Sequence, residues 1–226
     1  MGVHDGHRKR MKNRFVEHGL LNFDDHAVLE LLLFYAIPRA DTNVVAHALM
    51  DRFGKFHAVL DAPRSQLMEV AGIGEDSATL LNLIPQVCQR YMMSQNGDFP
   101  VLDSTTAAGR FCLPLFIGQK EELLFLICLD AGSRVMAYKE MARGGVDSVE
   151  LNVRKIAEVA LNAGAASIII AHNHTTGVAL PSVEDEATTR HLRMVLQPLE
   201  IELRDHIVVA GNDFISMADS GFFEQV

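Results

Sequence analysis

The sequence predicts an α/β domain, with a mixed sheet flanked by helices, that follows a smaller all-α domain. Up to Gln95, ten Lys or Arg side chains stand against eleven Asp or Glu side chains, whereas the rest of the chain has ten against eighteen. Apolar residues recur only at helical spacing in the first part, and strand patterns alternate with helical ones in the second. The stretch 94–100 contains Asn-Gly and Pro, which are typical of a linker. We therefore expect a helical domain at residues 1–95, a linker at 96–103 and the α/β domain at 104–226.

Helices and one tight turn are expected in the first domain. One helix follows Asp24-Asp25 and ends before Pro38, and the next opens at Asp41-Thr42-Asn43, because such polar residues cap helices and proline ends them. Further along, the step Gly72-Ile73-Gly74 separates two helical stretches and resembles a helix-hairpin-helix motif. In such motifs the glycines permit a tight turn, and the amides that open the second helix can bind a DNA phosphate.

The charges near these elements favour a packing role over nucleic-acid binding. Glu75 and Asp76 open the helix after the turn, where the motif usually has a basic residue, and carboxylates at this position repel phosphate. The arm at residues 7–14 contains five Lys or Arg side chains, which would give DNA only weak, salt-sensitive binding. A helical module without nucleic-acid affinity is therefore favoured, and DNA contact through the N-terminal region is the alternative.

The second domain has the pattern of a mixed sheet. The expected elements are, in order, strands at 123–129 and 134–138, a helix from 152 to about 163, a strand at 167–171, a helix from 182 to about 196, and strands at 205–210 and 214–217. Short turns join the first two strands and the last two, which predicts two hairpins. Helices between the remaining strands predict crossovers that cover the sheet.

Two histidines at the end of an apolar strand are the candidate metal ligands. Side chains two apart leave the same face of a strand, so His172 and His174 are expected to point together. Asp185 follows after one short loop and offers a carboxylate as a third ligand. Catalytic zinc has three protein ligands and an open fourth position for water. Ser182 with Asp185 also has the spacing of a helix capping box, which is the structural interpretation of these two residues.

The full spacing resembles a known signature. His172-x-His174, seven residues, Ser182, two residues and Asp185 matches the motif of the JAMM (MPN/JAB) metallopeptidase-like domains, and the surrounding sequence is similar to the RadC family, also called UPF0758. The similarity extends over nearly the whole chain. It implies a cytidine-deaminase-like JAMM/MPN fold behind the helical domain.

The resemblance also implies roles for residues. His172, His174 and Asp185 would bind one Zn²⁺ per chain, Glu122 would serve as general base, and Ser182 would hydrogen-bond the oxyanion of the tetrahedral intermediate. The implied function is a zinc-dependent hydrolase that cleaves an amide, peptide or isopeptide bond of a peptide or protein substrate. The alternative is a binding protein associated with DNA repair or recombination, in which the metal site is structural or idle.

The chain departs from the family pattern beside the site. Thr175-Thr176 stand before Gly177 where the family commonly has Pro-Ser, so the change affects the loop next to the ligands rather than the ligands themselves. The pattern His-Pro-Arg-Glu is commonly found before the central helix, and of it only Arg154 remains. Arg154 is interpreted as a surface residue, with contact to a substrate carboxylate as the alternative.

The composition predicts a cytoplasmic protein. We find no signal peptide pattern in the first thirty residues and no apolar run long enough for a membrane helix. Cys88, Cys112 and Cys128 are widely spaced in apolar surroundings, which predicts reduced and buried thiols. The sequence does not indicate an oligomeric state.

Overall fold

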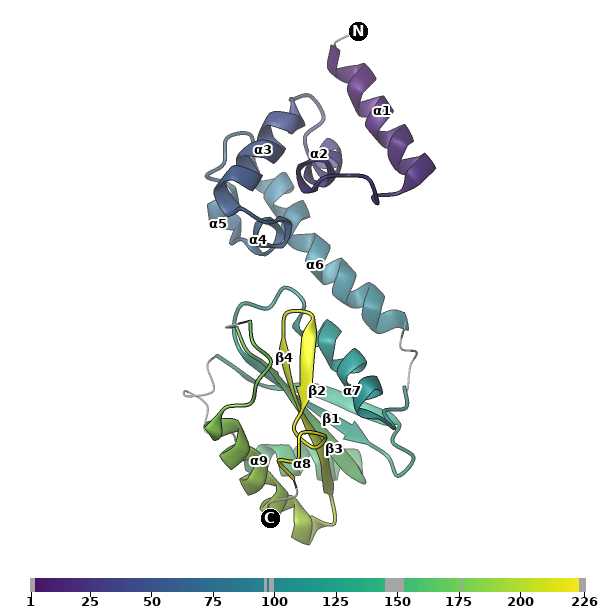
Figure 1. Cartoon of the computed structure of the whole chain (residues 1–226), viewed down its shortest axis with the longest axis vertical. Coiled ribbons are helices and arrows are strands. Elements are labelled where there is room, and N and C mark those ends of the chain that lie inside the picture. Colours follow the sequence, from purple (N-terminus) through teal and green to yellow (C-terminus); the bar gives the residue numbers. More distant parts are fainter. Residues whose placement is uncertain (1–2, 96, 98–99, 145–152, 176, 224–226) are drawn as a thin grey trace. The chain divides into compact units, whose positions relative to one another are not determined.

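The computed structural model describes residues 3–95, 97, 100–144, 153–175 and 177–223, and divides into two compact units. The units are Met1–Val87 and Cys88–Val226. The division falls within helix α6 (Glu75–Gln95), ahead of the linker expected at 96–103. The first unit is helical and the second holds the sheet, so the expected order of an all-α part and an α/β part is confirmed (Figure 1).

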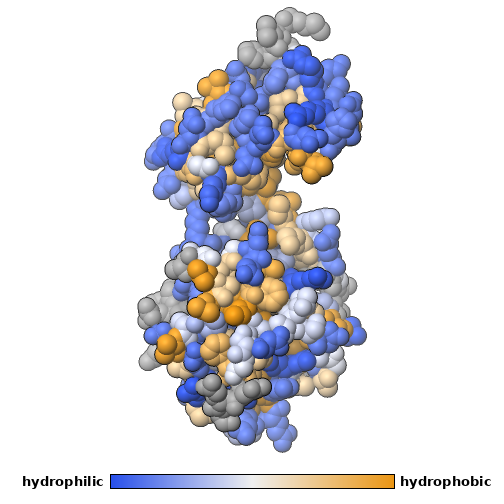
Figure 2. All heavy atoms as spheres, viewed as in Figure 1, coloured by the Kyte–Doolittle hydropathy of each residue, from blue (hydrophilic) through white to orange (hydrophobic). Residues whose placement is uncertain are grey.

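The first unit packs short helices around one apolar core. Its helices besides α6 are α1 (Val3–His18), α2 (Asp25–Ala36), α3 (Thr42–Phe53), α4 (Phe56–Asp61) and α5 (Arg64–Leu67). Leu29, Leu33, Leu49, Leu67 and Leu81 are fully buried in this core. The predicted start of α3 is confirmed, because the Asp41 side chain accepts a hydrogen bond from the Asn43 amide. Hydrophilic residues cover most of the visible face of this unit in Figure 2.

The turn that resembles a helix-hairpin-helix requires its first glycine. Gly72 has φ +92°, and a Cβ there would lie 2.7 Å from Cγ2 of Val45. The amide of Gly74 donates to Oγ of Ser77 at 2.9 Å, so this side chain already occupies the amide that a phosphate would meet. Glu75 pairs with Arg64 at 3.3 Å.

The second unit contains a five-stranded mixed sheet. The strands are β1 (Leu123–Leu129), β2 (Val135–Arg143), β3 (Ser167–Asn173), β4 (Glu202–Ala210) and β5 (Asp213–Ser216), and their order across the sheet is β2-β1-β3-β4-β5. Strands β3 and β4 are parallel, and the other neighbours are antiparallel. Both predicted hairpins, β1 with β2 and β4 with β5, are confirmed.

Helices cover both faces of this sheet. They are α7 (Thr105–Cys112), α8 (Val153–Ala163) and α9 (Val183–Leu196), with short 3₁₀ turns η1 (Leu113–Phe116) and η3 (Gln197–Leu199). One face carries the odd-numbered side chains of β1 and β3 and packs against α7, whereas the even-numbered side chains pack against α8 and α9 (Figure 1). Burial on both faces explains why β1 and β3 are continuous apolar runs rather than alternating ones.

Two findings concern the chain's expected environment. Cys112 and Cys128 are buried, but Cys88 is exposed on α6, so the prediction of a buried thiol is wrong for Cys88. Its apolar neighbour Val87 is also exposed, which shows that apolar flanks on this helix do not indicate a core. Over the described ranges, none of the helices combines the length and hydrophobicity that a membrane span needs.

Candidate metal centre

The paired histidines lie at the end of β3 on the face that α8 and α9 cover. The His174 amide donates to the Val209 carbonyl at 2.8 Å, which continues the β3–β4 ladder by one residue. Even-numbered β3 residues such as Ile168 and Ile170 pack on this face, so His172 and His174 leave it together, as the spacing predicts. The His172 side chain is buried, and that of His174 is 15% exposed. His174 therefore lies on the open side of the pair.

Asp185 brings a carboxylate from the first turn of α9 against both rings. His172 Nε2 is 3.2 Å from Oδ1 of Asp185, and His174 Nε2 is 3.4 Å from Oδ2. The two Nε2 atoms are 2.9 Å apart. Ligand atoms around a tetrahedral ion with bonds of 2.0–2.1 Å lie about 3.3 Å apart. The two ring nitrogens and the Asp185 carboxylate therefore have the chemistry and the spacing to hold one such ion.

His206 of β4 is a fourth group at this site. His172, Asp185 and His206 each offer a ligand atom within 4.8 Å of the others. However, His206 Nε2 lies 2.7 Å from Nδ1 of His172, the ring nitrogen that does not contact His174. His206 Nδ1 lies 2.6 Å from Oγ1 of Thr189. Because His206 contacts His172 through the ring nitrogen that does not face His174, we place His206 behind His172 and assign the third ligand position to His174.

Burial and hydrogen bonds set the charges of these groups. Burial alone would raise the pKa of the Asp185 carboxyl, but hydrogen bonds from the backbone amide and hydroxyl of Ser182 help to hold this pKa well below its ordinary value. Burial lowers the pKa of His206 well below its ordinary value, and the neighbouring His172 lowers it further. Asp185 is therefore a carboxylate and His206 a neutral ring at neutral pH.

Ser182 is the N-cap of α9 and forms the predicted capping box. Its Oγ accepts from the Asp185 amide at 3.1 Å, and its own amide donates to Oδ2 of Asp185 at 2.8 Å. The Ser182 hydroxyl also donates to the same Oδ2 at 2.7 Å. In this structure the Ser182 hydroxyl therefore donates its one hydrogen to Asp185, a candidate ligand.

Glu122 directly precedes β1, and the strand register places it beside the histidines. Leu124 pairs with His172 in the antiparallel β1–β3 ladder, so continuing the register by two residues puts Glu122 opposite His174. Residues directly opposite each other share a face of the sheet. The carboxylate of the preceding Glu121 lies 3.9 Å from Nη1 of Arg143.

Asn173, between the two histidines, holds the backbone on both sides of Glu122. Its Oδ1 accepts from the Leu123 amide at 2.7 Å, and its Nδ2 donates to the Glu121 carbonyl at 3.1 Å. The Glu122 carbonyl in turn accepts from the Gly144 amide at 2.9 Å. The backbone of Glu122 is thus fixed relative to β3.

Comparison with known proteins decides the family. Residues 102–222 match the family model described as a RadC-like JAB domain. The chain belongs to the RadC-like JAB domain family. It is 33% identical over 216 residues to a UPF0758 protein of Ruegeria pomeroyi, and the match covers 96% of each chain. It is 34% identical over 211 residues to a UPF0758 protein of Rhodobacter capsulatus, and the match covers 93% of this chain and 99% of the relative. A UPF0758 protein of Burkholderia cenocepacia is 32% identical over 219 residues, 96% of this chain and 85% of the relative.

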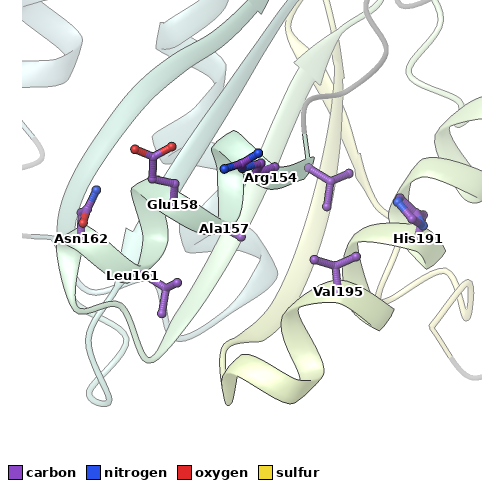
Figure 3. Close-up of a pocket in the computed structure, with 8 residues that line it drawn as sticks. Arg154, Ala157, Glu158, Leu161, Asn162, His191 and Val195 are labelled. Atoms are coloured by element: carbon purple, nitrogen blue, oxygen red, sulfur yellow. The ribbon is translucent and has the colours of Figure 1, made fainter.

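A separate pocket lies between α8 and α9 of this RadC-like domain (Figure 3). It has a volume of about 540 Å³ and is lined by Val153, Arg154, Ala157, Glu158, Leu161, Asn162, His191 and Val195. None of the candidate metal ligands lines it. Arg154 belongs to this pocket, which accords with its interpretation as a surface residue.

Some residues of the RadC-like site were not predicted from the sequence. His206, Thr189 and Asn173 contact the predicted ligands or the backbone on either side of Glu122, yet the sequence pattern assigned them no role. The only local signal was the polar pair Asp205-His206 inside an apolar strand. Residues 145–152 and Thr176, where the sequence resembles or departs from the family pattern, lie outside the described residues.

Proposed function

We propose that this chain is a zinc-dependent hydrolase of JAMM type, which cleaves an amide, peptide or isopeptide bond in a peptide or protein substrate. The observation that carries the proposal is the convergence of His172, His174 and Asp185. The β1–β3 register, continued two residues beyond Leu124, would put Glu122 opposite His174. Membership of the RadC-like JAB domain family supports it.

The donor set fits the proposed metal. Two imidazole nitrogens and one carboxylate are ligands that catalytic zinc commonly has, and zinc bound there would lower the pKa of its water towards about 7 and polarise the scissile carbonyl. His172 and Asp185 are buried, so their positions are fixed by packing. His174 is the more exposed ligand, and we propose that the substrate approaches on its side.

Glu122 is proposed to carry the proton. Its carboxylate accepts a proton from the attacking water as the new C–O bond forms. It then gives this proton to the leaving amine nitrogen as the C–N bond breaks. General acid–base transfer of this kind contributes roughly 10²–10⁴-fold to the rate.

Ser182 is proposed to have two successive hydrogen-bond acceptors. In the structure its hydroxyl donates to Oδ2 of Asp185 and so orients the carboxylate. During attack, the same hydrogen would turn towards the oxyanion. Removing one oxyanion donor typically costs about 10²–10³-fold in kcat.

Substitution of the proposed base tests the function. The full chain, loaded with Zn²⁺, would be incubated with synthetic peptides that contain α-linked and Nε-linked lysine, and the products would be read by mass spectrometry. We expect Glu122→Gln to keep its zinc, measured by elemental analysis, and to lower turnover by at least about 10²-fold. Glu121→Gln is the matched control, because the neighbouring Glu121 carboxylate pairs with Arg143 of β2, and it should retain turnover.

The outcomes separate the candidate functions. Turnover that survives in Glu122→Gln would contradict the mechanism. A chain that binds zinc in a 1:1 ratio but leaves every peptide intact would favour the alternative, a binding protein with an idle metal site. A chain without zinc affinity would remove both interpretations of the metal centre.

A further inference from the structure

A buried chain of hydrogen bonds connects two of the proposed ligands through two residues that are not proposed as ligands. It runs from His172 Nδ1 to His206 Nε2 at 2.7 Å, from His206 Nδ1 to Thr189 Oγ1 at 2.6 Å, and from Thr189 Oγ1 to the Asp185 carbonyl at 2.6 Å. His206 and Thr189 are 1% and 2% exposed, so water does not replace these bonds. The chain joins β3, β4 and α9 behind the metal centre.

The direction of each bond follows from its last acceptor. A carbonyl oxygen can only accept, so the Thr189 hydroxyl donates its one hydrogen to Asp185. The same oxygen must then accept from His206 Nδ1, which therefore carries the single proton of this ring, because a second proton would place an unpaired charge at 1% exposure. His206 Nε2 is left as an acceptor, and His172 Nδ1 donates to it. His172 Nε2 then holds a lone pair rather than a proton.

We propose that His206 and Thr189 are positioning residues, which fix His172 in the tautomer whose Nε2 lone pair faces His174 and Asp185. Metal ligands need an unprotonated nitrogen, and a partner at the other ring nitrogen fixes both the tautomer and the ring orientation. The inference rests on the metal centre of the proposed function, but it does not require that the chain be a hydrolase.

Two other arrangements of these groups predict different results. Thr189 Oγ1 also lies 3.7 Å from Sδ of Met217, but a thioether is a weak acceptor at a longer distance than the carbonyl. Alternatively, His206 itself could be a ligand, since one of its ring atoms lies near those of His172 and Asp185. In that case His206 would take the place of His174, and His174→Ala would keep its zinc affinity, whereas the proposal expects this variant to lose it.

The first test measures zinc affinity in the full chain by competition with a chromophoric chelator. Thr189→Val keeps the side-chain shape but leaves His206 Nδ1 without its acceptor, which favours the reversed tautomers of both rings. We expect zinc affinity to fall by about 10- to 100-fold. Thr189→Ser restores the hydroxyl and should bind zinc as the wild type does. An affinity in Thr189→Val equal to that of the wild type would overturn the proposal.

The matched control is the same substitution in the helical unit. Thr42 is also buried, and its Oγ1 has no hydrogen-bond partner among the residues that the structure describes. Thr42→Val should therefore leave zinc affinity unchanged. A similar loss in this variant would show that the Thr189→Val effect is not specific to the hydrogen-bond chain, and would also overturn the proposal.

The second test reads the tautomer without any metal. In the metal-free chain with ¹⁵N-labelled histidine, NMR should show His172 protonated at Nδ1, and Thr189→Val should shift His172 towards the Nε2-protonated form. Protonation of wild-type His172 at Nε2 would overturn the proposal. If the tautomer is as expected but the chain binds no zinc, the proposed function fails while the hydrogen-bond chain stands.

Discussion

Ser182 shows how one side chain can serve both the helix and the site. Its oxygen caps α9 by accepting from the Asp185 amide, while its hydrogen holds the Asp185 carboxylate that contacts His174. A hydroxyl can accept and donate at once, so the two contacts do not compete. Only the proposed contact with the oxyanion competes with the bond to Asp185.

Ser182→Ala separates these contributions. Loss of the cap should lower the free energy of unfolding by about 1 kcal/mol in a denaturant titration. Loss of the carboxylate contact should lower zinc affinity about tenfold. At saturating zinc, kcat should still fall by about 10²-fold if the hydroxyl reaches the oxyanion. Unchanged kcat under that condition would restrict Ser182 to orienting Asp185, and Ser182→Thr, which keeps the hydroxyl, serves as the control.

Between elements, the site depends on how β1 is held against β3. Glu122 precedes β1, and the ladder, continued two residues beyond the Leu124–His172 pair, puts it opposite His174. The Asn173 side chain supplies the connection, because it bonds the backbone immediately before and after Glu122. The residue between the two histidines thus belongs to the site through the backbone of the proposed base.

Asn173→Asp tests this connection. The substitution keeps the shape but replaces the Nδ2 donor with an oxygen, which repels the Glu121 carbonyl. A displacement of the base by about 1 Å can cost about 10²-fold in rate, so kcat should fall by about that factor while zinc content is retained. An unchanged kcat would show that Asn173 does not position Glu122.

Asn82→Asp is the matched control for this prediction. The Asn82 amide nitrogen also donates to backbone carbonyls, those of Leu60 and Ala62, each at 2.9 Å, but within the helical unit. This variant should lose stability by roughly 1–3 kcal/mol and keep its kcat. If kcat falls equally in Asn82→Asp, the loss of activity in Asn173→Asp would result from general destabilisation.

Sequence patterns predicted the elements and brought together the candidate ligands because both depend on short spacings. The same-face pair His172 and His174 follows from strand periodicity, and the capping box of Ser182 and Asp185 from helix geometry. The contacts of His206 with His172 and of Asn173 with Glu121 join residues that are 34 and 52 positions apart. Such pairs depend on strand order and register, which periodicity does not determine.

For the whole molecule, the distribution of cations bears on the nucleic-acid alternative. The chain has a net charge of −9, and the basic arm of α1 is partly used within the helical unit. Arg8 donates to the carbonyls of Ile37 and Ala40, each at 2.7 Å, and Arg14 donates to the carbonyl of Asn22. Lys12 lies 4.8 Å from the centre of the Tyr35 ring. Of the five cations of the arm, Lys9 and Arg10 are exposed and take part in none of these contacts.

We therefore expect the full chain to bind duplex DNA only weakly. Two cations on an acidic protein release few counterions, so any binding seen at about 20 mM salt should be lost at about 150 mM salt. Fluorescence anisotropy with a labelled duplex of arbitrary sequence measures this, and Lys9→Glu with Arg10→Glu should remove the residual signal. Tight binding that persists at the higher salt would contradict the expectation. It would then point to the helix-hairpin-helix turn, where the Gly74 amide could reach a phosphate only by releasing the Ser77 hydroxyl.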